Sequence, residues 1–201
     1  MLKGILLNFN WIDILMVCLI VRIIIVGIKS NILIEVLGLL GAVCATFVTL
    51  HYYAWFGGWL HKNIFIPEAI QDILAFVVVW LTVYVIFKLI INGWSLIFRI
   101  EAQATVNQWG GAVIAAARSL FVCGMTFMFL FLSGNDYIKK ISQQSFTGFY
   151  LTDFSPRTYR FIYDNFVAKF FPEEQLNEKA FDVGNADSHK KKHEKSKEKD
   201  R

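Results

Sequence analysis

Four long apolar stretches, separated by short polar segments, dominate the sequence. They cover residues 11–28, 32–54, 69–91 and 110–132. A helix needs ~20 apolar residues to cross a hydrocarbon core of ~30 Å, and each stretch comes close to that length. The pattern therefore predicts four transmembrane helices and an all-α integral membrane protein of the multi-pass class.

The polar segments between these stretches indicate how the helices connect. Only Lys29, Ser30 and Asn31 separate the first two spans, which is typical of a tight antiparallel helical hairpin. Residues 55–67 are rich in Trp and Gly and end in a proline, so they predict a connection at the membrane–water interface. Residues 94–109 mix apolar and charged positions and predict a short interfacial helix before the fourth span.

After the fourth span the chain becomes amphipathic and aromatic, and then highly charged. We expect C-terminal amphipathic interfacial helices up to residue 171 and a disordered, Lys-rich basic tail over residues 172–201. The membrane domain thus covers residues 1–171. The aromatic side chains expected to enter the interface are Phe161, Tyr163, Phe166 and Phe170. The basic side chains expected to meet lipid phosphates are Arg157, Arg160 and Lys169.

The composition agrees with a membrane protein. Hydrophobic residues make up 56% of the 201 residues and the mean hydropathy is +0.48, whereas soluble domains have about 45–50% apolar residues. Most of the net charge of +4 lies in residues 187–201. Such a tail fits a solvated segment or contact with anionic lipid better than a nucleic-acid partner, and we expect no nucleic acid to bind.

The sequence contains no pattern typical of an enzyme or a metal site. Motifs such as HExxH, GxSxG and the P-loop are absent. The three cysteines lie inside apolar stretches without CxxC spacing, which favours packing over disulfides or zinc. His51 and His61 are isolated and favour an interfacial position. We therefore expect no catalytic residues, no cofactor and no metal.

Charged residues in the apolar stretches are the main functional candidates, because a charge at the membrane centre costs about 2.5–3.5 kcal/mol. Those within the spans or at their rims are Asp13, Arg22, Glu35, Lys88 and Arg118. In a hairpin that turns near Ser30, Arg22 and Glu35 differ in depth by roughly 4–5 Å, so they could form an ion pair. Lys29, closer to water, is an alternative partner for Glu35, and Glu35 is also a candidate partner for Arg118. We predict an intramembrane polar cluster of Asp13, Arg22, Glu35 and Arg118. It would either fix helix register or form a polar pathway.

Small residues recur every four positions along the fourth span, at Gly111, Ala115 and Ser119. This spacing places them on one face of a helix, where another helix can approach closely. The face predicts helix packing within the chain or between protomers. Besides the lipid bilayer, a second copy or another membrane protein is therefore a possible partner.

The order of these residues resembles the colicin V production protein family (CvpA), four-span proteins of the bacterial inner membrane. The similarity covers roughly residues 10–164. The matching residues are Trp11, Asp13, Gly27, Glu35, Gly111 and Arg118. The departures are Val26, where the family pattern has arginine, Asn107, where it has aspartate, and Ala115 and Ser119, where it has glycine.

The resemblance implies a non-enzymatic inner-membrane protein involved in toxin (colicin V) production or export, or in envelope homeostasis. The charged residues leave a second interpretation open, a small transporter or channel with a buried Arg/Glu pathway. We expect both termini in the cytoplasm, because a lysine-rich tail is attracted to the anionic inner leaflet.

Overall fold

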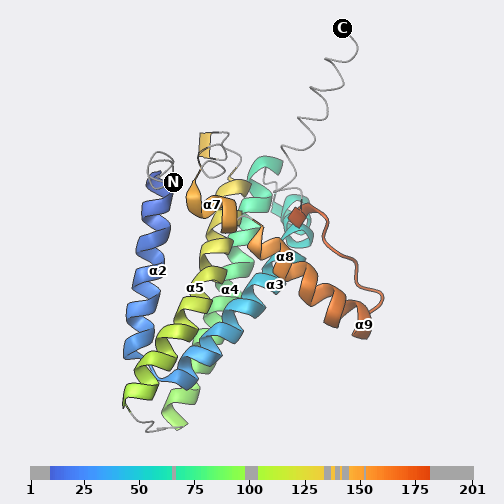
Figure 1. The fold of residues 1–201 in the computed structure, drawn as a ribbon. Coiled ribbons are helices and arrows are strands. Elements are labelled where there is room, and N and C mark those ends of the chain that lie inside the picture. The colour runs from blue at the N-terminus through green and yellow to red at the C-terminus, as the bar shows by residue number, and fades with distance from the viewer. Residues whose placement is uncertain are drawn as a thin grey trace.

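The computed structural model is built from long helices and shorter C-terminal ones. It describes residues 10–64, 67–97, 104–133, 137–138, 141, 145–151 and 153–181. The long helices are α2 (Trp11–Lys29), α3 (Ile32–Ile64), α4 (Glu68–Ile97) and α5 (Ala104–Leu132). The shorter elements are α7 (Phe146–Leu151), α8 (Phe154–Ile162), the π-helix η1 (Tyr163–Val167) and α9 (Ala168–Phe170). Figure 1 shows the long helices side by side, with α8 and α9 extending from one end of them.

All four long helices are long and apolar enough to cross a membrane. The spanning segments are Trp11–Lys29, Ile32–Asn63, Ile70–Trp94 and Gln108–Leu132. Pro67 stands directly before α4, where the missing N–H of proline breaks no helical hydrogen bond. The predicted all-α membrane fold with four spanning helices is confirmed.

The bundle has two distinct ends. At the hairpin end, α2 turns into α3 through Ser30 and Asn31, as the short polar segment predicts. At the opposite, terminal end, Asn10 begins the described chain and the C-terminal helices α7 and α8 pack (Figure 1). Direction alternates, so α2 and α4 run towards the hairpin end and α3 and α5 run away from it.

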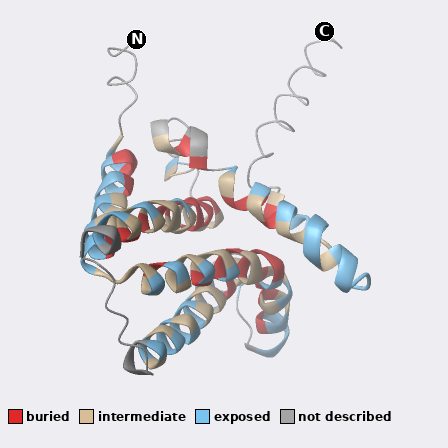
Figure 2. Ribbon diagram, turned by 60° about the horizontal axis from the view of Figure 1, so that its bottom comes forward, coloured by how far each residue is buried: buried red, intermediate tan, exposed pale blue. Residues whose placement is uncertain are grey.

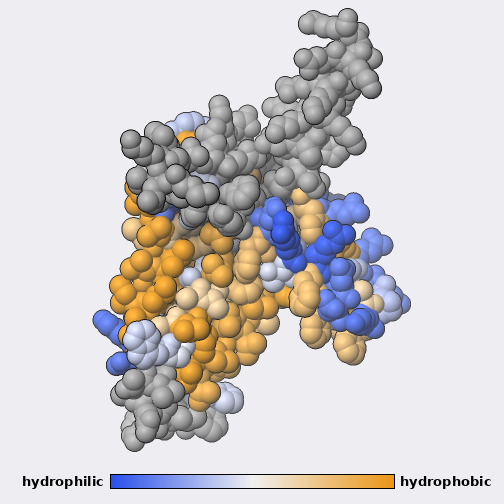
Figure 3. Space-filling view, in the orientation of Figure 1, coloured by the Kyte–Doolittle hydropathy of each residue, from blue (hydrophilic) through white to orange (hydrophobic). Residues whose placement is uncertain are grey.

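The helices do not pack in the order of the sequence. α2 packs mainly on α5, α5 also packs on α3, and α3 packs on α4. The outer helices α2 and α4 are the least buried, and residues such as Val26 and Leu81 expose about half of their surface (51% and 50%). Figure 3 shows the resulting apolar surface over the bundle in orange. This surface fits contact with lipid tails.

Two connections differ from the predictions. α3 continues ten residues beyond position 54, through most of the segment expected to form an interfacial connection. The extension is favoured because Gly57 and Leu60 are buried, with Gly57 close to Asp72 of α4. In place of a separate interfacial helix over residues 94–109, residues 94–97 end α4 and residues 104–109 begin α5. Residues 98–103 lie outside the described part of the chain.

The C-terminal arm, Phe154–Phe170, comprises α8, η1 and α9 and leaves the bundle sideways. Its base is buried, with Ser155 beside Gly124 of α5, and its tip is exposed (Figure 2). Phe161, Phe166 and Phe170 are exposed, as expected for side chains that enter an interface. Figure 3 shows hydrophilic atoms gathered over this side of the molecule. Contact of the arm with lipid stays a prediction.

After the arm the chain returns to the bundle as the C-terminal strap, residues 171–181. Ala180 is fully buried, and Leu176 and Phe181 pack against a cluster that includes Leu50 and Met125. A disordered tail starting at residue 172 is therefore wrong for the first ten of these residues. Its apolar residues Leu176, Ala180 and Phe181 contribute to this anchoring. Residues 182–201 lie outside the described part of the chain.

Candidate functional site

At the hairpin end, α2 and α5 touch through their backbones. A Cβ added to Gly111 would lie 2.5 Å from the carbonyl oxygen of Gly27, and one added to Gly27 would collide with the side chain of Ala115. Gly111 and Ala115 are buried, and Ser119 is 1% exposed. The small residues that were predicted to pack thus face other helices of the same chain. This crossing brings α3 close to both helices.

A buried ion pair lies beside this crossing. The Nη1 atom of Arg118 on α5 is 2.9 Å from the Oε2 atom of Glu35 on α3. The Glu35 side chain is 2% exposed and the Arg118 side chain 20%. Gly38, one turn along α3, leaves room for the guanidinium, since a Cβ there would lie 2.5 Å from Nη1. In a medium where an unpaired charge is costly, the pair lowers the cost of each partner.

Arg22 and Asp13 do not join this ion pair. The predicted Arg22–Glu35 pair is not formed, because Glu35 faces Arg118 on α5 while the Arg22 side chain is exposed. Asp13 is fully buried at the terminal end of α2, fourteen residues before Gly27 and so ~21 Å away along the helix. The structure brings together two of the four predicted residues.

Asp13 instead joins α2 to the chain near α7. It is the third residue of its helix and forms a capping box with Asn10, whose backbone N–H donates to its carboxylate at 2.9 Å. Its other oxygen accepts a hydrogen bond of 2.8 Å from the backbone N–H of Thr147 and a second from the Thr147 hydroxyl. Asp13 therefore accepts hydrogen bonds from both its own helix cap and Thr147.

Asn107 stands where the family pattern has an acid. It belongs to the first turn of α5, eleven residues before Arg118. Its side chain lies outside the described part of the structure. That the asparagine removes an acidic partner of Arg118 therefore stays a prediction from the sequence.

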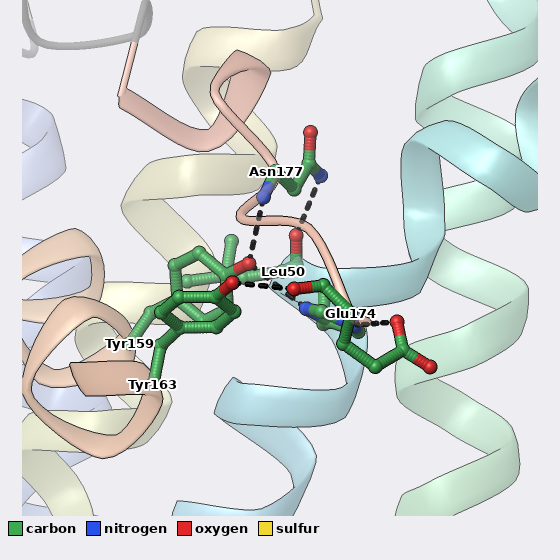
Figure 4. Close-up of polar contacts among 6 residues, drawn as sticks. Leu50, Tyr159, Tyr163, Glu174 and Asn177 are labelled. Atoms are coloured by element: carbon green, nitrogen blue, oxygen red, sulfur yellow. Dashed lines mark hydrogen bonds and ion pairs between the residues drawn. The ribbon is translucent and has the colours of Figure 1, made fainter. Parts of the chain in front are cut away.

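The terminal end holds a second polar group that the sequence did not indicate. His51 on α3 is buried, with Nδ1 2.9 Å from the hydroxyl of Tyr159 and Nε2 3.2 Å from the carboxylate of Glu174. Asn177 donates its backbone N–H to the Tyr159 hydroxyl at 2.9 Å and its side-chain amide to the carbonyl of Leu50 at 2.7 Å (Figure 4). These contacts fasten the strap to α3.

The polar atoms of this group can all be paired when the Tyr159 hydroxyl donates to His51. The Tyr159 oxygen accepts from Asn177, so its own proton can go to Nδ1 of His51, and Nε2 of His51 can then donate to Glu174. Burial raises the pKa of Tyr159 to about 12, so the hydroxyl stays protonated at neutral pH. His51 was expected to be an isolated interfacial residue. Its partner Glu174 comes from the segment predicted to be disordered, and its partner Tyr159 comes from a predicted interfacial helix.

Comparison with known proteins identifies one family. The model of the colicin V production protein family matches residues 12–156 of this chain. The matched region includes Gly27, Glu35, Gly111 and Arg118, the residues that meet at the hairpin end. It confirms the resemblance seen in the sequence. Comparisons with curated proteins and with solved structures gave no match.

Proposed function

Since the chain belongs to the colicin V production protein family, we propose that it acts without catalysis in the bacterial inner membrane, in toxin production or export or in envelope homeostasis. The observation that carries this proposal is the pairing of Arg118 with Glu35 beside the contact between Gly27 and Gly111. A buried charge held this way stabilises one arrangement of spanning helices. It supports a protein that works as a folded membrane scaffold for partners.

A charge-swap experiment tests whether the pair is structural. A bacterium that lacks its own family member and carries a toxin operon would be complemented with wild type, Glu35→Arg, Arg118→Glu or the double variant. Secreted toxin activity and the amount of folded protein are measured together. We expect each single variant to lose toxin secretion and folded protein. The double variant should regain part of each. Failure of the double variant to secrete toxin while it folds normally would contradict a purely structural pair.

The proposed orientation puts both termini in the cytoplasm, so the hairpin end faces the periplasm. Single cysteines at Ser30 and Ser188 would be tested with a membrane-impermeant thiol reagent on intact cells. Cys18 and Cys44 are exposed within the spans and would first be replaced by alanine. We expect labelling at position 30 and none at position 188. The reverse pattern would invert the orientation.

A small transporter or channel is the second candidate. It is favoured by a cavity of about 480 Å³ between the four long helices, which Arg118 borders. In this case Arg118→Lys should leave the protein folded but abolish solute or proton flux in proteoliposomes. If wild-type protein shows no flux under any ion gradient, the scaffold proposal gains and the transport proposal fails.

A further inference from the structure

The cavity between the spanning helices has a closed floor and an open side. Its floor includes Ala45 of α3 and Met125 of α5, both buried, whereas Val26 of α2 and Leu81 of α4 on its walls are half exposed. The opening therefore lies between the two outer helices, on the surface that fits lipid tails. Its volume of about 480 Å³ is within the ~300–1,000 Å³ typical of small-molecule sites.

Three basic side chains border this otherwise largely apolar cavity. They are Arg22 of α2, Lys88 of α4 and Arg118 of α5. Arg118 is neutralised by Glu35. Among the residues that the structure describes, neither Arg22 nor Lys88 forms an ion pair, and the ammonium of Lys88 lies 6.0 Å from the ring centroid of Tyr84. Two positive charges at the cavity therefore have no acidic partner within this part of the chain.

The contacts between α2 and α5 place Arg22 and Arg118 at similar depth. The two helices run in opposite directions and meet where Gly27 lies against Ala115. Arg22 precedes Gly27 by five residues and Arg118 follows Ala115 by three, so both lie on the terminal side of this contact. At 1.5 Å per residue their levels are ~7.5 and ~4.5 Å beyond it.

Lys88 lies near the same level on the other wall. α3 and α4 also run in opposite directions, and Gly41 lies against Phe87. Since Arg118 contacts Gly38, three residues before Gly41, Lys88 is displaced from that contact by only ~3 Å along the bundle. The basic side chains thus form one layer across the cavity.

This layer separates a basic part of the cavity from an apolar part, and a phospholipid likewise has a charged headgroup and apolar acyl chains. Arg22 lies seven residues before the last residue of α2, so its Cα is ~10 Å from the hairpin end, within reach of the headgroup region for a long side chain. Further from that end the cavity continues past Thr46, Trp80 and Met125 towards the middle of the bundle. Positive charge near one surface and apolar space towards the centre match an anionic headgroup above its acyl chain.

We propose that this cavity binds one anionic phospholipid. Its phosphate lies between Arg22 and Lys88, and one acyl chain follows the groove along Ala42 and Ala45 towards Trp80. Arg118 keeps its ion pair with Glu35 and closes the inner side of the headgroup site. The bound lipid would supply the negative charge that Arg22 and Lys88 lack in the described chain.

Native mass spectrometry of the detergent-purified full chain tests the proposal, with phosphatidylglycerol and phosphatidylcholine as probes. We expect wild type to retain phosphatidylglycerol preferentially, and Arg22→Gln with Lys88→Gln to weaken that retention roughly tenfold or more. The matched control is Lys29→Gln with Lys62→Gln, which removes two exposed charges outside the cavity. The control should stay within about twofold of wild type.

A second variant, Ala42→Phe, narrows the groove without changing charge and should also reduce retention. If the double glutamine variant does not fold, Ala42→Phe still tests lipid binding in the cavity. Size-exclusion profiles and melting temperatures report folding for every variant. Equal binding of the two lipids by wild type, or equal loss in the cavity and control variants, would mean ordinary surface attraction and overturn the proposal. Because lipid retention is measured on purified protein, its result is independent of any role in export.

Discussion

At the hairpin end of the bundle the spanning helices are joined by close backbone contact and one ion pair, whereas at the terminal end side-chain clusters and segments that do not span the membrane join them. The hairpin contact consists of the glycine crossing and one ion pair, Glu35–Arg118. The terminal contact consists of two apolar clusters and hydrogen bonds made by Thr147 and the strap. Most of the fully buried large side chains belong to this second end.

The difference lies in how each end can respond to change. Backbones in contact cannot adjust as side chains do, so a single added group must separate the helices. Contacts made of many side chains lose strength in steps, because each hydrogen bond contributes only about 1 kcal/mol. A single substitution at the hairpin end should therefore disrupt its helix packing as a whole, whereas substitutions at the terminal end should each remove part of its stability.

The largest effect is expected from Gly111→Leu. Its Cβ alone would lie 2.5 Å from the carbonyl oxygen of Gly27, and the remaining atoms must push α2 away from α5. We expect a cost of more than about 3 kcal/mol and the loss of monodisperse protein in size-exclusion chromatography. Gly93→Leu is the control, because nothing lies within 4 Å of a Cβ at that position. Equal destabilisation of the two variants would mean that the Gly27–Gly111 contact does not determine the stability of the hairpin end.

The next largest effect is expected from Arg118→Ala, which leaves the carboxylate of Glu35 buried without its cation. Removing one partner of a buried pair typically costs about 3–5 kcal/mol. We expect a clear drop in melting temperature. The double variant Glu35→Leu with Arg118→Met replaces both charges by apolar groups and should return to within about 1 kcal/mol of wild type. A double variant as unstable as Arg118→Ala would show that the pair itself supplies the stability.

At the terminal end, Tyr159→Phe should loosen the strap and leave the bundle folded. The change removes the hydroxyl that accepts from Asn177 and contacts His51, at a cost of about 1–2 kcal/mol. We expect faster tryptic cleavage at Lys179 with little change in global melting temperature. Gln175→Ala, an exposed strap position, is the control. Loss of the whole fold would mean that the two ends are one cooperative unit.

The two ends also differ in how far the sequence predicts them. Hydropathy predicts the spans because burying a helix in lipid depends on its own composition. The glycine and small-residue positions predict the hairpin-end packing because close approach requires small side chains wherever it occurs. Even there, the sequence leaves Arg22, Lys29 and Arg118 open as partners of Glu35, since it cannot show that α5 rather than α2 faces that side of α3.

The terminal end is predicted poorly because its contacts join residues far apart in the sequence. His51 and Glu174 are separated by 123 residues, and Asp13 and Thr147 by 134. Neither pair has a local spacing pattern, and the apolar residues of the strap are interspersed with as many charged ones. Its anchoring depends on Ala180 and Phe181 fitting a surface that exists only after the helices have packed.

The smallest effect expected is a pH dependence confined to the terminal end. Burial raises the pKa of Tyr159 from its usual value of 10.0 to about 12, so between these pH values Tyr159 loses its phenolic proton when the strap is undocked and keeps it when the strap covers it. The docked state then binds more protons, and its stability falls as pH rises, by roughly 1 kcal/mol near pH 10.5. Hydrogen exchange of strap amides relative to α5 amides, compared between neutral and alkaline pH, measures this loss. Tyr159→Phe should lack it, and an equal loss in that variant would assign the effect to another group.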